Sequence, residues 1–304
     1  MDIIKDISKV NIDKKAAVAL GKFDGIHLGH LEIINKILEK KSLGYIAMVF
    51  TFDISAAGFF KGSPVKEVTT IKEKECIFES MGVDVLVEFP LNKETAATDP
   101  VGFITDILVD SLNMKYIVAG DDISFGYKGQ GNKELLYKYA PVCGYEVDII
   151  DKLTLEGRDI SSTYVREEIS KGNMNMVTKL LGHPYSFAGT VKQGFKLGHK
   201  LGMPTLNLYP DPEKILPPLG VYYSKVYHKG AMYPGITNIG MRPTVSETDR
   251  ISVETYLYDF DKDMYGEDIV TELLEFKRPE MKFSSVEDLK AQMNLDILEG
   301  KKYV

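Results

Sequence analysis

Short, continuous apolar runs alternate with segments of helical spacing through the first half of the chain. The apolar runs cover Ala16–Leu20, Tyr45–Phe52, Val83–Phe89, Tyr116–Ala119 and Tyr145–Ile150. Between them, apolar residues fall on one side of a helix over residues 31–38, 71–81 and 103–108. Because a strand that is buried on both faces reads as an uninterrupted apolar run, this alternation predicts a Rossmann-like α/β domain whose parallel sheet is covered by helices.

The second half loses this periodicity after the stretch Leu181-Gly182-His183-Pro184. Short strand-like runs broken by glycine and proline follow, at Phe187–Lys192, Pro204–Leu208, Gly220–Tyr227, Ile251–Phe260 and Asp268–Phe276. This pattern predicts a small antiparallel β-barrel. A helix capped by Ser284 or Ser285 is expected to close the chain, with Val286, Leu289 and Met293 on one face. We therefore expect two domains, residues 1–182 and residues 183–304.

Charge and cysteine content restrict the class of protein. The chain has 304 residues, a formal net charge of −7 and two cysteines, so neither a nucleic-acid partner nor a disulfide framework is expected. The first ten residues, MDIIKDISKV, carry charges within their apolar stretch, which is unlike a signal peptide. No run reaches the roughly 18 apolar residues that a spanning helix needs. These features predict a cytoplasmic protein without a membrane partner.

The sharpest motif is Gly21-Lys22-Phe23-Asp24-Gly25-Ile26-His27-Leu28-Gly29-His30, which joins the first apolar strand to the first helix. Open α/β sheets bind ligands at this edge, beyond the carboxyl ends of their strands. A helix start offers N–H groups to a phosphate, and glycine lets the backbone approach it. His27 and His30, one turn apart, can donate to the same phosphoryl oxygens. The alternatives are a histidine pair that only packs, or a metal site whose third ligand is not evident.

In this setting H-x-G-H resembles the nucleotidyltransferases that transfer AMP or CMP to a phosphate. Two further stretches are Gly120-Asp121-Asp122-Ile123-Ser124-Phe125-Gly126 and Ile160-Ser161-Ser162-Thr163-Tyr164-Val165-Arg166. Together with the histidine motif they are similar to the FMN adenylyltransferase module of bacterial bifunctional riboflavin kinase/FAD synthetases. The resemblance implies catalytic roles for His27 and His30, and ATP binding by Gly21, Phe23, Asp24, His27, His30, Asp122, Ser162, Thr163 and Arg166. Taken alone, the serine-threonine run would read as an N-cap.

The second half has no G-x-x-x-x-G-K-[ST] motif, so a P-loop kinase is not predicted. Instead, Gly189, Gly194, Gly198 and Gly202 precede the stretch Met203-Pro204-Thr205-Leu206-Asn207. Such glycines can free backbone N–H groups for phosphates. Thr205 and Asn207 would share one side of a strand, where a hydroxyl and an amide oxygen suit Mg²⁺. A simple turn is the alternative for this stretch.

Further along, Asn238-Ile239-Gly240-Met241-Arg242-Pro243-Thr244-Val245 and Val253-Glu254-Thr255-Tyr256-Leu257-Tyr258-Asp259-Phe260 are followed by Tyr265-Gly266. These stretches resemble the riboflavin kinase barrel of the same family. The resemblance implies that Glu254 is the general base for the ribityl 5′-hydroxyl. It also implies that ATP or flavin is bound by Gly198, Thr205, Asn207, Asn238 and Arg242, with Thr205 and Asn207 as Mg²⁺ ligands. An exposed strand carboxylate is the alternative for Glu254.

The resemblance covers nearly the whole chain and implies a bifunctional enzyme. Riboflavin and ATP would give FMN in the barrel, and FMN and ATP would give FAD in the first domain, both with Mg²⁺. The chain departs from the family pattern at Ile54-Ser55-Ala56-Ala57, where Pro-His-Pro is usual, and at His183 and His199. A monofunctional enzyme with one degenerate domain, another nucleotidyltransferase and a flavin sensor are the alternatives. Weak self-association is left open.

Overall fold

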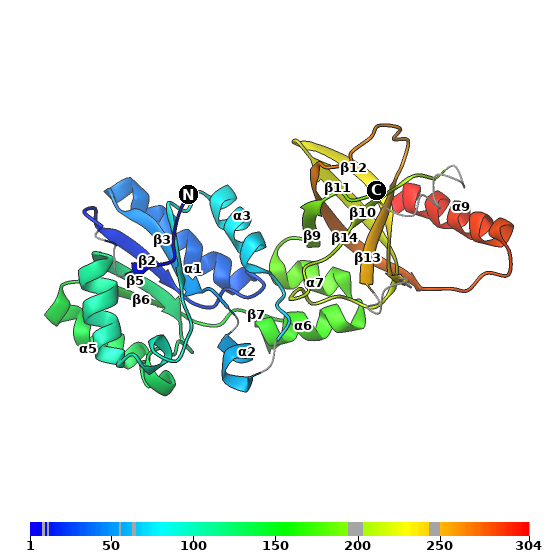
Figure 1. Ribbon diagram of the computed structural model, residues 1–304. Coiled ribbons are helices and arrows are strands. Elements are labelled where there is room, and N and C mark those ends of the chain that lie inside the picture. The colour runs from blue at the N-terminus through cyan, green and yellow to red at the C-terminus, as the bar shows by residue number, and fades with distance from the viewer. Residues whose placement is uncertain are drawn as a thin grey trace. The chain divides into compact units, whose positions relative to one another are not determined.

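The computed structural model describes residues 1–7, 10, 12–54, 56–62, 65–193, 203–242 and 250–303 (Figure 1). The chain divides into two compact units, Met1–Tyr164 and Val165–Val304. The domain boundary expected from the sequence, at Gly182, falls at the end of a helix in the second unit and stays a prediction. Within the described residues, no helix has the length and apolar character needed to cross a membrane.

The first unit is built on a six-stranded sheet whose strands all run parallel. In chain order the strands are β1 (Asp2–Ile4), β2 (Ala16–Leu20), β3 (Ile46–Phe52), β4 (Val85–Phe89), β5 (Met114–Gly120) and β6 (Glu146–Ile150). Their order in space is β1-β4-β3-β2-β5-β6. From β2 the chain first builds outward through β3 and β4, and then returns to the other side of β2 for β5 and β6. The carboxyl end of β2 is therefore the topological switch point, where such sheets bind ligands.

Helices cover both faces of this sheet (Figure 1). The helices of this unit are α1 (Leu28–Glu39), α2 (Ala56–Lys61), α3 (Ile71–Met81), α4 (Pro100–Gly102), the π-helix Phe103–Ser111 and α5 (Lys133–Cys143), with short 3₁₀ turns at Lys40–Leu43, Thr95–Ala97 and Tyr127–Gly129. Side chains of α1 and α3 join the core on one face, and side chains of the π-helix and α5 join the core on the other. A two-stranded ribbon, β7 (Thr154–Leu155) and β8 (Arg158–Asp159), precedes α6 (Ser162–Lys171). The predicted α/β class is confirmed.

The second unit is a six-stranded antiparallel sheet with the order β10-β13-β12-β11-β14-β9. Its strands are β9 (Tyr185–Thr190), β10 (Thr205–Leu208), β11 (Gly220–His228), β12 (Ala231–Arg242), β13 (Arg250–Leu257) and β14 (Asp268–Pro279). The sheet curls until its two edge strands, β9 and β10, come together. The N–H of Lys192, just past β9, donates to the carbonyl of Asn207 on β10 at 2.9 Å. The predicted small antiparallel barrel is confirmed.

Two helices of the second unit flank the barrel in the sequence, α7 (Met174–Leu181) before it and α9 (Val286–Tyr303) after it. Ser285 caps α9 by accepting from the N–H of Asp288 at 3.1 Å, as expected. Leu289 and Met293 are half-buried. Val286 was expected on the same face but is 54% exposed, because the helix meets the barrel mainly through its later turns, near Asp296 and Gly300.

The anchor of α9 is a buried ion pair with β14. Arg278 donates from Nε and Nη2 to Oδ2 of Asp296 at 3.0 and 2.6 Å. The other oxygen of Asp296 accepts from Gln292 at 2.9 Å, and the Asp296 side chain is only 3% exposed.

Removal of the buried carboxylate should loosen this helix. We expect Asp296→Ala to lower the free energy of unfolding of the second unit by about 3 kcal/mol, because the Arg278 guanidinium loses its partner. Denaturant unfolding measures the change. The double variant Arg278→Met, Asp296→Leu should recover most of the loss, since it leaves no unpaired charge. Equal losses in both variants would contradict this account.

Candidate active sites

The histidine motif forms a strained turn at the carboxyl end of β2. Phe23 and Ile26 have φ angles of 49° and 43°, in the left-handed region that non-glycine residues rarely adopt. Gly25 lies between them at φ 89°. A Cβ at Gly21 would stand 3.1 Å from the Phe23 ring, so this ring would have to shift slightly to admit a side chain. Such strain is stored where surrounding contacts hold the backbone in place, which is typical of functional sites.

His27 and His30 stack face to face at the start of α1. Their ring centroids are 3.7 Å apart with an interplanar angle of 16°, and Phe23 meets His30 edge-on at 5.2 Å. His27 is the N-cap residue of α1, and its side chain makes no capping hydrogen bond within the described residues. The Nδ1 atoms of both rings are buried and find no hydrogen-bond partner in that same part of the chain. The polar edges of both imidazole rings therefore lie at the N-terminus of α1, which is the positive end of the helix dipole.

Burial keeps both imidazoles neutral in the free protein. It lowers the pKa of His27 to about 4, although the carboxylates of Asp24 and Asp122 act in the opposite direction. It also holds the pKa of His30 well below its usual value, with further lowering by His27 and Lys74. A bound polyphosphate would reverse this balance, because nearby negative charge favours the protonated ring.

The low pKa of His27 has a consequence for stability. In the unfolded chain His27 titrates near 6.5, whereas in the folded protein its pKa is about 4. Between these values the unfolded state binds the extra proton, so this histidine destabilises the fold as pH falls from 6.5 towards 4. The full effect corresponds to about 3 kcal/mol, at about 1.36 kcal/mol for each pKa unit.

We therefore expect His27→Gln to reduce the loss of stability of the first unit between pH 6.5 and pH 4. Denaturant unfolding of the wild type and the variant at several pH values measures the difference. Parallel pH profiles for the two proteins would contradict the expectation.

Contacts from two distant segments hold the motif turn. Oδ1 of Asp24 accepts from the N–H groups of Val68 and Thr69 at 2.7 and 3.3 Å. The carbonyl of Asp24 accepts from the hydroxyl of Ser162, the first residue of α6, at 2.7 Å. The serine-threonine stretch that begins α6 therefore lies against the histidine motif. Asp24 was expected to contact ATP, and in the structure its carboxylate ties the motif to the chain that leads into α3.

The remaining residues expected at this site lie on several elements. Asp122 follows β5, is 69% exposed and pairs with Lys152 at 3.1 Å. Ser161 accepts from the N–H of Tyr164 at 3.3 Å and so caps α6, which leaves Ser162 and Thr163 on its first turn. Arg166 follows in α6, beyond the division between the two units. The nucleotide-binding roles of all these residues stay predictions.

The second site is set by strand register. Asn207 on β10 lies directly opposite Glu254 on β13, and Glu254 lies directly opposite Asn238 on β12. Thr205 pairs with Tyr256 two residues away, so Thr205, Asn207, Glu254 and Asn238 share one face of the sheet. The hydroxyl of Ser252 donates to Oε1 of Glu254 at 3.1 Å. A carboxylate, a hydroxyl and two amides thus converge from three neighbouring strands.

This donor set fits Mg²⁺ better than a soft metal. Among the described residues, no cluster of three histidine, cysteine or acidic side chains could hold a metal ion. The side chain of Asn207 is buried and its Nδ2 donates to the Thr205 carbonyl at 3.0 Å. That bond orients the amide, and the groups along this row are oxygen-bearing carboxylate, hydroxyl and amide side chains. Hard oxygen ligands are those that Mg²⁺ prefers.

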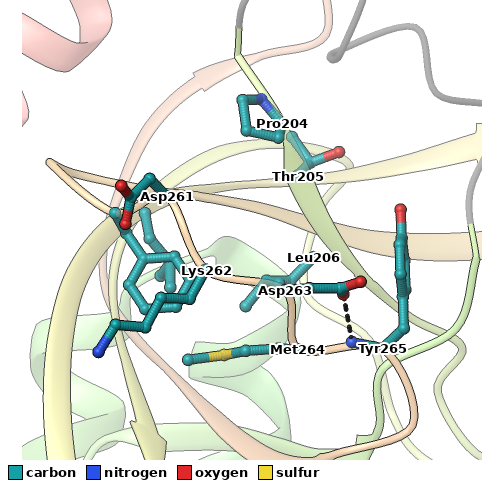
Figure 2. Close-up of a pocket in the computed structure, with 10 residues that line it drawn as sticks. Pro204, Thr205, Leu206, Asp261, Lys262, Asp263, Met264 and Tyr265 are labelled. Carbon is teal, nitrogen blue, oxygen red and sulfur yellow. Dashed lines mark hydrogen bonds between the residues drawn. The ribbon is translucent and has the colours of Figure 1, made fainter.

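A pocket of about 170 Å³ lies beside this row (Figure 2). Pro204, Thr205 and Leu206 form one wall, and the loop from Phe260 to Tyr265, together with Leu257, forms the rest. Asp263 braces the loop by accepting from the N–H of Tyr265 at 2.8 Å. In the sequence Tyr265 stands out only as part of the Tyr265-Gly266 motif, because the pocket requires the loop after β13 to fold back onto β10.

Two predicted residues of this site cannot be placed by their side chains. Gly198 falls among residues 194–202, which are outside the described residues, and so does His199. Arg242 ends β12, and the description of this residue stops at its backbone.

Comparison with known proteins connects each site to one domain. The family model described as FAD synthetase matches residues 9–164, and the model described as riboflavin kinase matches residues 181–304. Two curated relatives are both named bifunctional riboflavin kinase/FMN adenylyltransferase. The relative from Listeria monocytogenes is 35% identical, over 96% of this chain and 91% of its own. The relative from Escherichia coli K12 is 33% identical, over 94% and 92%.

A solved structure matches the whole fold. It is named as a macrolide-efflux protein from Streptococcus pneumoniae, with a TM-score of 0.85, 29% identity and coverage of 98% of both chains. The two domain matches and the full-length relatives agree with each other in order and extent. The chain therefore belongs to the bifunctional riboflavin kinase/FMN adenylyltransferase family and carries both catalytic domains.

Proposed function

We propose that the second unit phosphorylates riboflavin to FMN, and that the first unit transfers AMP from ATP to FMN to give FAD and pyrophosphate. One observation carries the proposal: each matched domain contains its own cluster of polar groups suited to a triphosphate. The first cluster is the stacked histidine pair at the switch point. The second is the row of Asn207, Glu254 and Asn238 across three strands.

In the first unit, His27 and His30 would donate to ATP phosphate oxygens at the start of α1. Adenylyl transfer needs little covalent help, so positioning and stabilisation of developing charge carry most of the catalysis. The rings are stacked and held by the strained turn before they meet the nucleotide, which avoids reorganisation during the reaction. Ser162 and Thr163 would add donors from the start of α6.

In the second unit, Glu254 would accept the proton of the ribityl 5′-hydroxyl as that oxygen attacks the γ-phosphate of ATP. The hydroxyl of Ser252 holds one oxygen of the carboxylate at 3.1 Å and so limits its rotation. Thr205 and Asn207 would hold Mg²⁺, which supplies charge neutralisation on the phosphates. The pocket beside Thr205, with Leu257, Phe260 and Met264 in its walls, suits the flat apolar surface of a nucleotide base.

A product assay tests both activities with the full chain. Riboflavin with ATP and Mg²⁺ should yield FMN and then FAD, and FMN with ATP should yield FAD and pyrophosphate, each separated by HPLC. Failure to form FMN from riboflavin removes the kinase, and failure to form FAD from supplied FMN removes the adenylyltransferase.

A further inference from the structure

Helix α3 turns two buried side chains, Lys74 and Phe78, towards the histidine motif. Phe78 meets Phe23 edge-on, with ring centroids 5.8 Å apart. Lys74 is only 3% exposed, and its Nζ donates to the carbonyl of Lys22 at 3.2 Å. A capping box between Thr70 and Glu73 fixes the start of α3 just before these residues. The helix therefore presents one aromatic ring and one cation to the turn that carries His27 and His30.

The carbonyl of Lys22 is a fixed point at the entrance to the strained turn. It accepts from Lys74 at 3.2 Å and from the hydroxyl of Thr51, at the end of β3, at 3.1 Å. The left-handed residue Phe23 follows directly, and the left-handed Ile26 comes three residues later. Backbone in such conformations persists only when its surroundings over-determine it. With Lys74 removed, the Thr51 hydroxyl is the remaining donor to this partly buried carbonyl among the described residues, and the turn can relax.

A buried ammonium is a costly way to hold a loop. Its charge must be removed from water, and an apolar side chain of similar length would avoid that cost. Glu67, 13% exposed, is the carboxylate beside it, at 3.4 Å. The cation lowers the pKa of His30 together with His27, whereas the carboxylates of Asp24 and Asp122 act to raise the pKa of His27. A positive charge beside a site that would bind phosphates attracts their negative charge, and packing alone does not explain its presence.

We propose that Lys74 is a positioning residue for adenylyl transfer: it holds the Lys22 carbonyl, and through it the histidine pair, in the arrangement that receives the triphosphate. The inference rests on the proposed function of the first unit. Helix α3 then supports the histidine motif through the hydrogen bond from Lys74 to Lys22, and Lys74 does not contact the substrate.

The test compares Lys74→Met with Lys72→Met, which removes an exposed lysine from the same helix. We expect Lys74→Met to lower kcat for FAD formation at least tenfold, with Lys72→Met unchanged. FMN formation by the second unit is the internal control and should be unchanged in both. If Lys74→Met does not fold, as judged by circular dichroism, the variant Lys74→Met, Glu67→Gln is used instead, because it leaves no unpaired carboxylate.

A second readout does not depend on activity. Histidine NMR of the nucleotide-free protein should show His30 titrating at higher pH in the Lys74 variant than in the wild type, since a neighbouring positive charge has been removed. The titration in Lys72→Met should match the wild type. A folded Lys74 variant with an unchanged kcat, or with an unchanged His30 titration, overturns the proposal. If the wild type makes no FAD, it is the proposed function that fails, and the titration still reports on the link between Lys74 and His30.

Discussion

Replacement of Glu254 by glutamine is expected to lower kcat for riboflavin phosphorylation by about 10²–10⁴-fold, the usual contribution of a positioned general base. The amide keeps the size and the hydrogen bond to Ser252 but cannot accept the hydroxyl proton. Glu254 has no nearby carboxylate substitute in its row, since its cross-strand neighbours are Asn207 and Asn238. Because the interaction is made in the transition state, kcat and kcat/KM should fall together.

The matched control is Glu275→Gln. Glu275 is also a half-buried carboxylate on a strand of the barrel, but it lies on β14, opposite Tyr223 and separated from β13 by β12 and β11. It should leave FMN formation unchanged, and neither variant should alter FAD formation from supplied FMN. Continuous assay of ADP release measures the first reaction. A Glu254→Gln enzyme that retains more than a tenth of the wild-type kcat would remove Glu254 from the role of base.

The architecture was accessible from the sequence where burial leaves a clear pattern. Strands such as β2, with every residue buried, read as continuous apolar runs. The elements that were not predicted contain residues that argue against a strand or a helix. β1 has three residues, of which two are exposed, and β12 contains Pro234, Gly235 and Gly240, which read as breaks although the strand pairs through all three. α5 accommodates Pro141 within its length.

The two candidate sites could be predicted from the sequence only in part. The histidine spacing predicted two rings on one helix turn, and the rings indeed stack. Asn207 and Glu254 face each other only because of the pairing of β10 with β13, and a sequence does not reveal which strands pair. Lys74 carried no signal at all, because a lysine in an amphipathic helix is ordinarily exposed. Its burial follows from the approach of α3 to the motif, a tertiary contact.

The second large effect is expected at the histidine pair. His30→Ala should lower kcat for FAD formation by about 10²–10³-fold, as does the loss of one preorganised donor to a developing negative charge. The ring is already fixed by stacking on His27 and by the edge of Phe23, so its loss removes both a donor and the support of its neighbour. The double variant His27→Ala, His30→Ala should therefore lose less than the product of the single effects, because the rings act as a unit.

Proton uptake gives this prediction a further observable. Both imidazoles are neutral in the free protein, with the pKa of His27 near 4, and phosphate favours their protonated forms. ATP binding to the first unit should therefore take up protons near neutral pH, which calorimetry detects as a dependence of the binding heat on buffer ionisation. His30→Ala should reduce the uptake, whereas His228→Ala, on a hairpin of the barrel and paired with Glu267, should not. Adenylyl transfer that survives His30→Ala at the wild-type rate would show that the stacked pair is a packing feature, and the site would then have to be sought elsewhere along the carboxyl edge of the sheet.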